Sequence, residues 1–275
     1  MTTWRRFRRS AIAVTALGFV VFVALVALAA PLLAPQPPDA IDLGRRLLPP
    51  GGDHLLGTDD LGRDVLSRLI HGARVSLAVG LLATALALVV GSTLGAIAGY
   101  YGGAADWVVS RLIEVILCFP FLLLVLAIVA LFQPSLWTVL VALAITSWTT
   151  EARFVRAEFL RLRELEFAQA ARASGARDPR IIFRHLLPNA LAPLLVSASF
   201  GVASAVLTES ALSFLGFGVA LPTPSWGSIL AVAYEYIELA WWLALFPGLA
   251  IFVTVAAFNL IGDRLRDALD PRSET

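Results

Sequence analysis

The sequence predicts an all-α integral membrane protein with six transmembrane helices and both termini in the cytoplasm. The first observation is composition: 59% of the 275 residues are hydrophobic and only 15% are charged, against roughly a quarter charged in an ordinary soluble domain. The second is that six apolar windows are long enough to cross about 30 Å of hydrocarbon, which takes about 20 helical residues. The third is that arginine gathers in three segments that a six-span topology places on one face.

The predicted spans are residues 11–34, 75–100, 107–131, 134–150, 189–215 and 240–262. The fourth span is the shortest of the six. The first span follows a basic segment, residues 1–10, as the core of a secretory signal would. Its apolar run is longer than a signal core, however, and it ends in Pro31 without a clear small-residue cleavage motif. We interpret it as a retained first transmembrane helix, although an uncleaved signal anchor would show the same pattern.

Arginine distribution predicts the orientation, because loops that stay in the cytoplasm carry an excess of basic residues. Four arginines precede the first span, eight lie in residues 150–188, and three follow the last span. The loops at residues 35–74 and 216–239 are near neutral or acidic. Residues 1–10 and the end of the chain are therefore expected in the cytoplasm, with residues 35–74 outside and residues 75–275 as one core transmembrane domain.

The external loop at residues 35–74 is predicted to end in an amphipathic helix. Asp60 precedes the string LGRDVLSRLI and is expected to cap that helix, because its side chain can accept hydrogen bonds from free backbone N–H groups. A short helix of this kind most simply lies along the membrane interface. Its apolar side would carry Leu61, Val65, Leu66 and Leu69.

Three glycines predict how the second span packs. Gly91, Gly95 and Gly99 recur at four-residue intervals, which places them on one helical face and lets another helix backbone approach closely. We interpret this face as a packing surface rather than a ligand site.

Charged residues and a proline shape the third span. Asp106 is expected to cap its start. Arg111 and Glu114 lie three residues apart on one helical face and are expected to neutralise each other near the cytoplasmic boundary. Pro120 should bend the helix, because proline removes a backbone hydrogen bond.

Residues 150–188 form a charged island in an otherwise apolar sequence. They carry eight arginines and five acids, and inserting thirteen charges at roughly 3 kcal/mol each would cost on the order of 40 kcal/mol. The island is therefore expected outside the hydrocarbon, between the fourth and fifth spans. Its first helix should end at Gly175, and a second should begin with Asp178 as its cap and Pro179 in its first turn. Pro188 should stop or kink that helix before the fifth span.

Three strings in the sequence resemble the permease subunits of ABC importers. The sequence QAA at residues 169–171, followed by Gly175 and by LP at residues 187–188, resembles the loop by which such subunits grip their ATPases. The string HLLGTDDLGRDVLSRLIHGARVSL at residues 54–77 resembles the segment before the second span of dipeptide, oligopeptide and nickel importer permeases. The string NLIGDRLRDALDPR at residues 259–272 resembles the close of the same permeases. The resemblance covers most of the chain and implies the type I ABC importer permease fold.

The resemblance also implies which residues couple this chain to an ATPase, through a thin, alanine-rich coupling helix that docks into a cleft. The implied coupling residues are Gln169, Ala170, Ala171, Arg172, Ala173, Ser174, Gly175, Ala176, Arg177, Asp178 and Pro188. Gln169 replaces the glutamate of the family pattern, so a salt bridge to the ATPase is not expected there. His185 stands where the general pattern is apolar, as is common in the peptide-transport branch. The alternative is a basic loop that contacts lipid head groups, and the helix caps on both sides argue against it.

Glu209 is an acid predicted to lie late in the fifth span, and an intramembrane acid is a functional candidate by default. It could line the translocation path and meet the ammonium group of a peptide. It could instead be a buried structural acid paired with Arg74 or with an arginine of a partner chain. We favour the structural interpretation, because the surrounding string LTESALSFLGFG recurs in the family whatever the solute is.

The resemblance implies the smaller, C-type membrane subunit of a binding-protein-dependent importer, because the outer loop is shorter than is typical of the B-type partner. The implied assembly is this chain, a homologous B-type permease, two ABC ATPase subunits and an external solute-binding protein. It would lie in the cytoplasmic membrane of a bacterium or an archaeon. The implied cargo is di- or oligopeptides, with nickel or another small solute as the alternative.

Composition places the ATP chemistry on the partners. The chain has no lysine, and a phosphate-binding P-loop needs one to reach the nucleotide phosphates. ATP and Mg²⁺ are therefore expected on the partner ATPases, with no cofactor, metal or catalytic residue on this chain and no nucleic acid among its partners. The lone Cys118 is interpreted as a packing residue.

Two other classes of protein remain as alternatives. An ion-coupled carrier without an ATPase would need paired acids near mid-membrane, whereas Glu114 and Glu209 both lie toward span ends. A membrane scaffold or enzyme is the other class. An enzyme would need its reactive groups at one depth, and His54, His71 and His185 are predicted on opposite faces.

Overall fold

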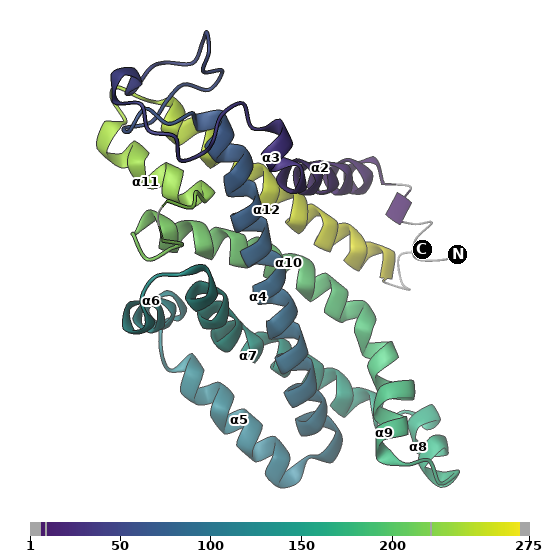
Figure 1. The fold of residues 1–275 in the computed structure, drawn as a ribbon. Coiled ribbons are helices and arrows are strands. Elements are labelled where there is room, and N and C mark those ends of the chain that lie inside the picture. The colour runs from purple at the N-terminus through teal and green to yellow at the C-terminus, as the bar shows by residue number, and fades with distance from the viewer. Residues whose placement is uncertain (1–6, 9, 221, 270–275) are drawn as a thin grey trace.

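The computed structural model describes residues 7, 8, 10–220 and 222–269, and all its regular secondary-structure elements are helices. This confirms the predicted all-α class. The helices, labelled as in Figure 1, are α2 (Ala11–Leu28), α3 (Ala30–Leu33), α4 (Val65–Tyr101), α5 (Gly103–Leu117), α6 (Phe121–Phe132), α7 (Leu136–Leu162), α8 (Glu166–Ala173), α9 (Asp178–Ile181), α10 (Leu187–Phe214), α11 (Trp226–Tyr236) and α12 (Trp242–Leu269). The described residues also include a 3-10 turn at Leu43–Arg45 and a π-helical turn at Ile182–Leu186.

Among the described residues, four helices are long and apolar enough to cross a membrane: α2, α4, α12 and the part of α10 at Pro193–Phe214. Helices α5 and α6 pass the same test together, but they are bent by 85° at the break between them. The structure thus offers four apolar crossings, or five if the bent pair is one span. A chain of this kind is a multi-pass membrane protein.

Helix α4 is longer than the predicted second span, and its first turns include most of the residues predicted to form a separate interfacial helix. It runs without a break from Val65 to Tyr101, because the sequence has no proline in this range to interrupt it. Asp64, and not Asp60, is its N-cap: the Asp64 carboxylate accepts from the Ser67 N–H at 2.8 Å. The prediction of a separate helix before the second span is therefore wrong.

The third predicted span is broken rather than merely bent. Helix α5 ends at Leu117 and α6 begins at Phe121, directly after Pro120. The expected bend at Pro120 is confirmed, and its size turns the pair into a corner. Arg111 and Glu114 form the expected ion pair on the exposed face of α5.

Asp106 does not cap the third span, because α5 already begins at Gly103 with Gly102 as its N-cap. Its carboxylate instead accepts hydrogen bonds from two nitrogens of the Arg156 guanidinium, on α7. A bidentate pair of this kind fixes both position and orientation. Asp106 therefore ties α5 to α7.

Helix α7 extends well beyond the predicted fourth span and into the charged island. It runs to Leu162, because buried residues continue at intervals of three and four after Trp148, at Ala152, Val155, Phe159 and Leu162. Most charges of this stretch lie on the other sides of the helix or are paired, and Glu151 is buried beside α4, so residues 150–162 belong to the bundle. The helix expected to end at residue 150 thus ends at Leu162.

Helices α4 and α7 meet along the glycine face predicted for the second span. A Cβ atom built on Gly91, Gly95 or Gly99 would lie 2.6, 2.5 or 2.7 Å from the nearest atom of α7. Real Cβ atoms do not come so close, so only glycine permits this approach. The predicted packing role of these glycines is confirmed.

The loop before α4 folds around buried charges. Asp59 accepts from the Arg63 guanidinium at 2.7 Å and lies 3.3 Å from Arg68 Nε. Asp64 Oδ1 lies 3.0 Å from His54 Nδ1. All five side chains are almost inaccessible, and buried charges are stable only when they are paired. The network fixes the loop on the first turn of α4.

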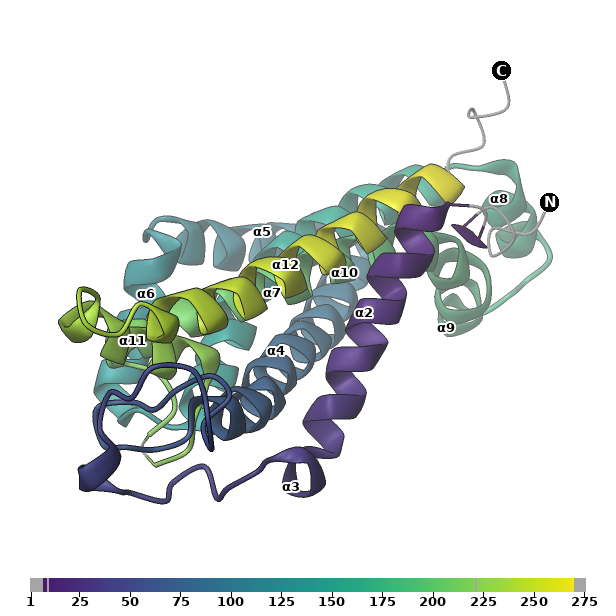
Figure 2. The ribbon, with the colours of Figure 1, turned by 90° about the horizontal axis from the view of Figure 1, so that it is seen from above.

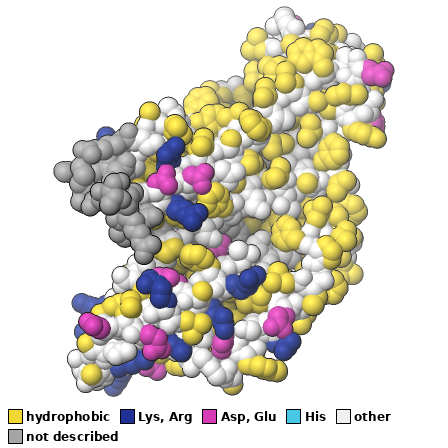
Figure 3. Space-filling view, turned by 180° about the vertical axis from the view of Figure 1, so that it is seen from behind, with side chains coloured by type: hydrophobic (Ala, Val, Ile, Leu, Met, Phe, Trp, Pro, Cys, Tyr) yellow, Lys and Arg dark blue, Asp and Glu magenta, His cyan; other side chains and the backbone are white. Residues whose placement is uncertain are grey.

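The two ends of the helical bundle carry different elements. Figures 1 and 2 place α8, α9, the start of α2 and the end of α12 at one end, with α11 and the loop before α4 at the other. Phe7, Ala13 and Ala268 share one buried cluster, so the start of α2 packs on the end of α12. Figure 3 shows arginine and acidic side chains clustered over the lower part of one face, with hydrophobic side chains over most of the upper part.

Candidate functional site

The segment between α7 and α10 begins with the eight-residue helix α8, whose last residue is Ala173, and Gly175 follows its C-cap Ser174. Gly175 has a φ of +76°. Its N–H donates to the Arg172 carbonyl at 2.9 Å, and the Ala176 N–H donates to the Ala171 carbonyl at 3.1 Å. These two bonds form a Schellman motif, which satisfies carbonyl groups that a helix end leaves free. The prediction that Gly175 closes this helix is confirmed.

Helix α9 begins one residue earlier than predicted. Arg177 is its N-cap and Asp178 its first residue, with Pro179 in the first turn. The Asp178 side chain makes no capping hydrogen bond. Its Oδ1 instead accepts from the Tyr100 hydroxyl at 2.7 Å. The expected cap is therefore wrong, and Asp178 makes a tertiary contact with the end of α4.

Pro188 does not stop the helix that follows α9. Residues 182–186 form a π-helical turn, in which the Leu187 N–H donates to the Ile182 carbonyl, and the chain continues directly into α10. Proline has no N–H to donate, so Pro188 cannot make the usual helical bond to the Arg184 carbonyl four residues earlier. The Asn189 side chain donates to the His185 carbonyl at 2.6 Å. The chain accommodates Pro188 by widening one turn.

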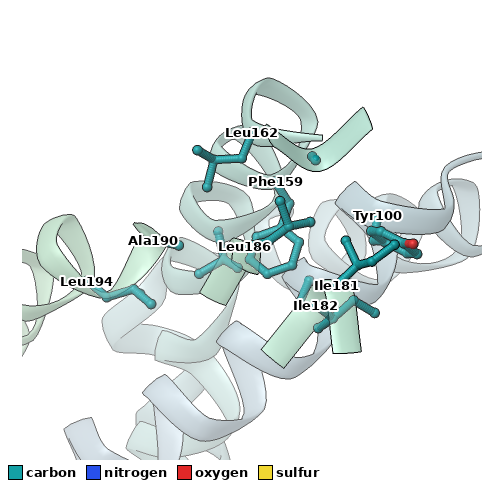
Figure 4. Close-up of a cluster of buried hydrophobic side chains, with 11 residues drawn as sticks. Tyr100, Phe159, Leu162, Ile181, Ile182, Leu186, Ala190 and Leu194 are labelled. Atoms are coloured by element: carbon teal, nitrogen blue, oxygen red, sulfur yellow. The ribbon is translucent and has the colours of Figure 1, made fainter. Parts of the chain in front are cut away.

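A buried hydrophobic cluster joins α8 and α9 to three long helices. Figure 4 shows side chains from these elements converging at the base of the segment. A tightly packed interior transmits displacement because it resists compression. The members of this cluster, called the base cluster below, are Ala96, Tyr100, Val155, Phe159, Leu162, Ala168, Ile181, Ile182, Leu186, Ala190 and Leu194.

Polar contacts reinforce the base cluster at the end of α4. The Arg172 guanidinium lies 5.2 Å from the centre of the Tyr100 ring, in range of a cation–π contact. Arg163 Nη1 donates to the carbonyls of Gly99 and Tyr100 at 3.0 and 3.2 Å, which caps the helix end with a cation. Tyr100 thus contacts α8 through Arg172 and α9 through Asp178.

One face of α8 is free to meet another protein. Ala168 is buried and Ala171 is partly buried against the base cluster. The remaining predicted coupling residues of this segment are exposed or partly exposed: Gln169, Ala170, Arg172, Ala173, Ser174, Gly175, Ala176, Arg177 and Asp178. The Gln169 amide donates to the Glu164 carbonyl of its own chain at 3.0 Å. Pro188 lies apart from them, in the first turn of α10.

Glu209 lies inside the bundle and is fully buried. Its carboxylate accepts from the Ser76 hydroxyl at 3.0 Å and from the Ser213 hydroxyl at 2.7 Å. Its partners are therefore serines of α4 and α10 and not Arg74, the intrachain partner weighed from the sequence. Pairing with an arginine of a partner chain stays a prediction.

A second buried acid, Glu151, was missed by sequence reasoning because it was assigned to the charged island. It lines a cavity of about 410 Å³ between α4, α7, α10 and the α5–α6 corner. The signal that places it in the bundle was the continuing three- and four-residue spacing of Trp148, Ala152 and Val155 around it.

The fold is shared with solved ABC transporter chains. Two crystal forms of the MetNI methionine ABC transporter in inward-facing conformations match with TM-scores of 0.61 and 0.58, at 21% and 20% sequence identity. The matches cover 74% of this chain and 98% and 97% of those chains. These matches show the fold alone, which is the fold of the matched ABC transporter chains.

Sequence comparison then gives the family. Residues 91–275 match the model of the binding-protein-dependent transport system inner membrane component, and residues 2–50 match the N-terminal transmembrane domain of oligopeptide transport permease C. This chain belongs to the family of inner membrane components of binding-protein-dependent transport systems. The family indicated by the residue patterns of the coupling segment and the outer loop is confirmed.

Several relatives resemble the chain over nearly its whole length. The dipeptide transport system permease protein DppC of Alkalihalophilus pseudofirmus is 44% identical, over 99% of this chain and 90% of the relative. The di/tripeptide transport system permease protein DppC of Pseudomonas aeruginosa is also 44% identical, over 98% and 91%. The glutathione transport system permease protein GsiD of Pectobacterium atrosepticum is 43% identical, over 98% and 90%.

Proposed function

We propose that this chain is the membrane-spanning subunit of an ATP-driven, binding-protein-dependent importer of di- or oligopeptides. Relatives named as dipeptide and di/tripeptide permeases match it over nearly its whole length. The observation that carries the proposal is the α8–α9 segment, which exposes a small-residue helix face while its base is packed on α4, α7 and α10. A segment built in this way can receive force from a soluble partner and pass it to the membrane helices.

The surface proposed to dock on an ATPase is the exposed face of α8 and the turn after it, from Gln169 to Asp178. The small side chains let α8 lie deep in a groove, and the arginines of this face add positive charge to its rim. Pro188 would act at a distance, through the π-helical turn that links α9 to α10. Closure of two ATPases on ATP would then move α8, and the base cluster would move α4, α7 and α10 with it.

The remaining parts of the transporter are proposed from family membership. They are a homologous B-type permease, two ABC ATPase subunits and an external solute-binding protein. ATP and Mg²⁺ would bind to the ATPases, since this chain lacks the lysine of a P-loop. The role of this chain is to bind, position and move, with no bond broken on it.

Six crossings with both chain ends in the cytoplasm are the topology that we propose. It counts α7 and the bent α5–α6 pair as one crossing each, beside the four apolar helices. The start of α2 and the end of α12 lie at the same end of the bundle as α8 (Figure 2), and this end carries most of the arginine. The membrane would be the cytoplasmic membrane of a bacterium or archaeon.

Uptake by the complete importer in proteoliposomes tests this function. Labelled di- and oligopeptides and labelled nickel would be compared, with and without ATP, for the wild type and for Gly175→Val. The φ of +76° at Gly175 is strained for a β-branched residue by about 1–2 kcal/mol. We expect ATP-dependent peptide uptake by the wild type and a large loss of uptake in the variant.

Gly216→Val is the matched control, because Gly216 also has a positive φ, +83°, and open space around it, but lies after α10 at the other end of the bundle. It should bear similar backbone strain and keep ATP-driven uptake. Accumulation of nickel alone would replace the peptide assignment with the small-solute alternative. Uptake that needs no ATP and follows a proton gradient would contradict the importer and favour the ion-coupled carrier.

A further inference from the structure

The cavity between α4, α7, α10 and the α5–α6 corner contains one acid, Glu151, whose carboxylate is only half satisfied. Glu151 is 5% exposed. Its Oε1 accepts from the Ser197 hydroxyl of α10 at 2.8 Å. Its Oε2 is buried and has no hydrogen-bond partner among the described residues. A buried carboxylate oxygen without a partner is costly, so an occupant that supplies a donor is expected.

Glu151 lies deep in the bundle and not at its rim. A Cβ atom on Gly91 would come within 2.6 Å of Glu151 Cβ, so the acid lies beside the membrane-spanning helix α4. Gly91 is ten residues before the end of α4 at Tyr101, which corresponds to about 15 Å along the helix axis. An acid buried among membrane-spanning helices is expected to meet a cation or line a solute pathway.

The rest of the cavity wall supplies hydroxyls and apolar surface. The hydroxyl of Thr84, on α4, is also buried without a partner. Phe119, Phe121 and Leu124 of the corner and Phe200 of α10 provide apolar walls. Among the described residues that line the cavity, no arginine or histidine supplies a positive charge. A cation that pairs with Glu151 inside the cavity is therefore not supplied by the described lining residues.

We infer that this cavity is a solute site on the translocation path and that Glu151 binds the ammonium group of a peptide. The volume of about 410 Å³ lies within the range of small-molecule sites. The carboxylate and the free Thr84 hydroxyl would hold the polar end of the solute. The apolar walls would accept side chains of varied shape, because they offer no fixed polar partner. This inference rests on the proposed function.

Glu209 is less suited to this role than Glu151. Both of its carboxylate oxygens already accept from serine hydroxyls, and it is fully buried. Glu151 keeps one oxygen free and faces a cavity. The acid that meets the solute is thus the one that the sequence placed outside the membrane.

The first test compares Glu151→Gln with a matched control on the same helix in the complete importer. Glu158→Gln removes a carboxylate of α7 that pairs with Arg161 and does not line the cavity. Uptake of a labelled dipeptide and the ATP hydrolysis stimulated by the loaded binding protein are measured together. We expect Glu151→Gln to lower uptake about tenfold, as for the loss of one charge-assisted hydrogen bond, with ATP hydrolysis retained. Glu158→Gln should change neither.

Equal uptake by Glu151→Gln and the wild type would overturn the inference and leave the proposed function standing. Absence of ATP-driven peptide uptake in the wild type would contradict the proposed function, and the inference would fall with it. Loss of the B-type permease from the purified Glu151→Gln complex would also overturn the inference, because Glu151 would then pair with a cation of that subunit.

A second measurement keeps Glu151 intact and so does not depend on the folding of its variants. Ser147 lines the same cavity, and Ser147→Cys in a Cys118→Ser background gives a single thiol there. Cationic and anionic methanethiosulfonates of similar size are compared in the complete complex. We expect the cationic reagent to react about tenfold faster, because a nearby carboxylate attracts it. Equal rates would overturn the inference.

The same thiol reports on the solute. An unmodified dipeptide should slow the reaction of Ser147→Cys with the cationic reagent. The N-acetylated form of the same dipeptide, which lacks the ammonium group, should not. Equal protection by both peptides would show that the ammonium group is not what the site recognises.

Discussion

At the residue scale, Tyr100 joins the end of α4 to both helices of the α8–α9 segment. Its ring lies in the base cluster, its hydroxyl donates to Asp178 of α9, and the guanidinium of Arg172 on α8 lies over its face. The three contacts differ in kind, so they can be removed separately. Tyr100 is therefore a positioning residue for the surface proposed to meet the ATPase.

Tyr100→Phe removes only the hydroxyl and keeps the ring. Loss of the hydrogen bond to Asp178 should cost about 1 kcal/mol in the positioning of α9. We expect fewer peptides imported per ATP hydrolysed, with assembly retained, in proteoliposomes that contain the complete importer. Tyr101→Phe is the control, because Tyr101 is exposed and meets Tyr100 only edge-on. Equal coupling ratios in both variants would contradict the positioning role.

The sequence predicts residues well where the deciding partner is close along the chain. Gly175 ends α8 because its own backbone conformation and two neighbouring bonds decide the matter. Asp106 and Asp178 were expected to cap helices, as acids at such positions usually do. Their partners, Arg156 and Tyr100, are distant in sequence and could be found only once the helices were packed.

At the element scale, the contact between α4 and α7 organises the core. The glycine face of α4 lets the backbone of α7 approach, and this approach carries Glu151 into the bundle. Spacing alone predicted the glycine face. The length of α7 was underestimated because charge was weighed above periodicity, although Val155, Phe159 and Leu162 continue the buried side of the helix.

Gly95→Ala should separate these helices. The added Cβ would lie 2.5 Å from the Ala152 carbonyl oxygen and 3.0 Å from its Cα, and neither backbone atom can turn away as a side chain would. Overpacking of this kind costs about 1–3 kcal/mol. We expect a lower Tm of the purified complex, measured by differential scanning fluorimetry.

Gly18→Ala is the control for that measurement, because nothing lies within 4 Å of a Cβ at Gly18. It should leave the Tm unchanged or raise it slightly, since alanine favours helix. A Tm for Gly95→Ala that matches the control would show that α4 and α7 can move apart without loss of stability.

At the scale of the whole molecule, the arrangement separates an arginine-rich end, with α8 and α9, from an end built of α11 and the loop before α4 (Figures 1 and 2). The sequence predicted this separation through arginine placement and loop acidity. It did not predict how the loop folds, because the pairing of His54 with Asp64 and of Asp59 with two arginines depends on contacts across several turns.

Cysteine labelling in intact cells checks the proposed orientation. In a Cys118→Ser background, Asp53→Cys places a thiol at an exposed position of the outer loop, and Ser174→Cys places one after α8. A membrane-impermeant maleimide should label Asp53→Cys directly and Ser174→Cys only after permeabilisation. The opposite pattern would reverse the orientation of the chain.

The unbroken helix α4 can transmit a displacement from one end of the molecule to the other. Its 37 residues extend about 55 Å at 1.5 Å per residue, well beyond about 30 Å of hydrocarbon. The buried charge network clamps one end at Asp64, and Tyr100 and the base cluster clamp the other. A shift of α4 along its helix axis at one end is therefore passed to the other end, because no break in the helix lies between them. Arrival of a loaded binding protein and closure of the ATPases would thus act on a single mechanical coordinate, the position of α4 along its own axis.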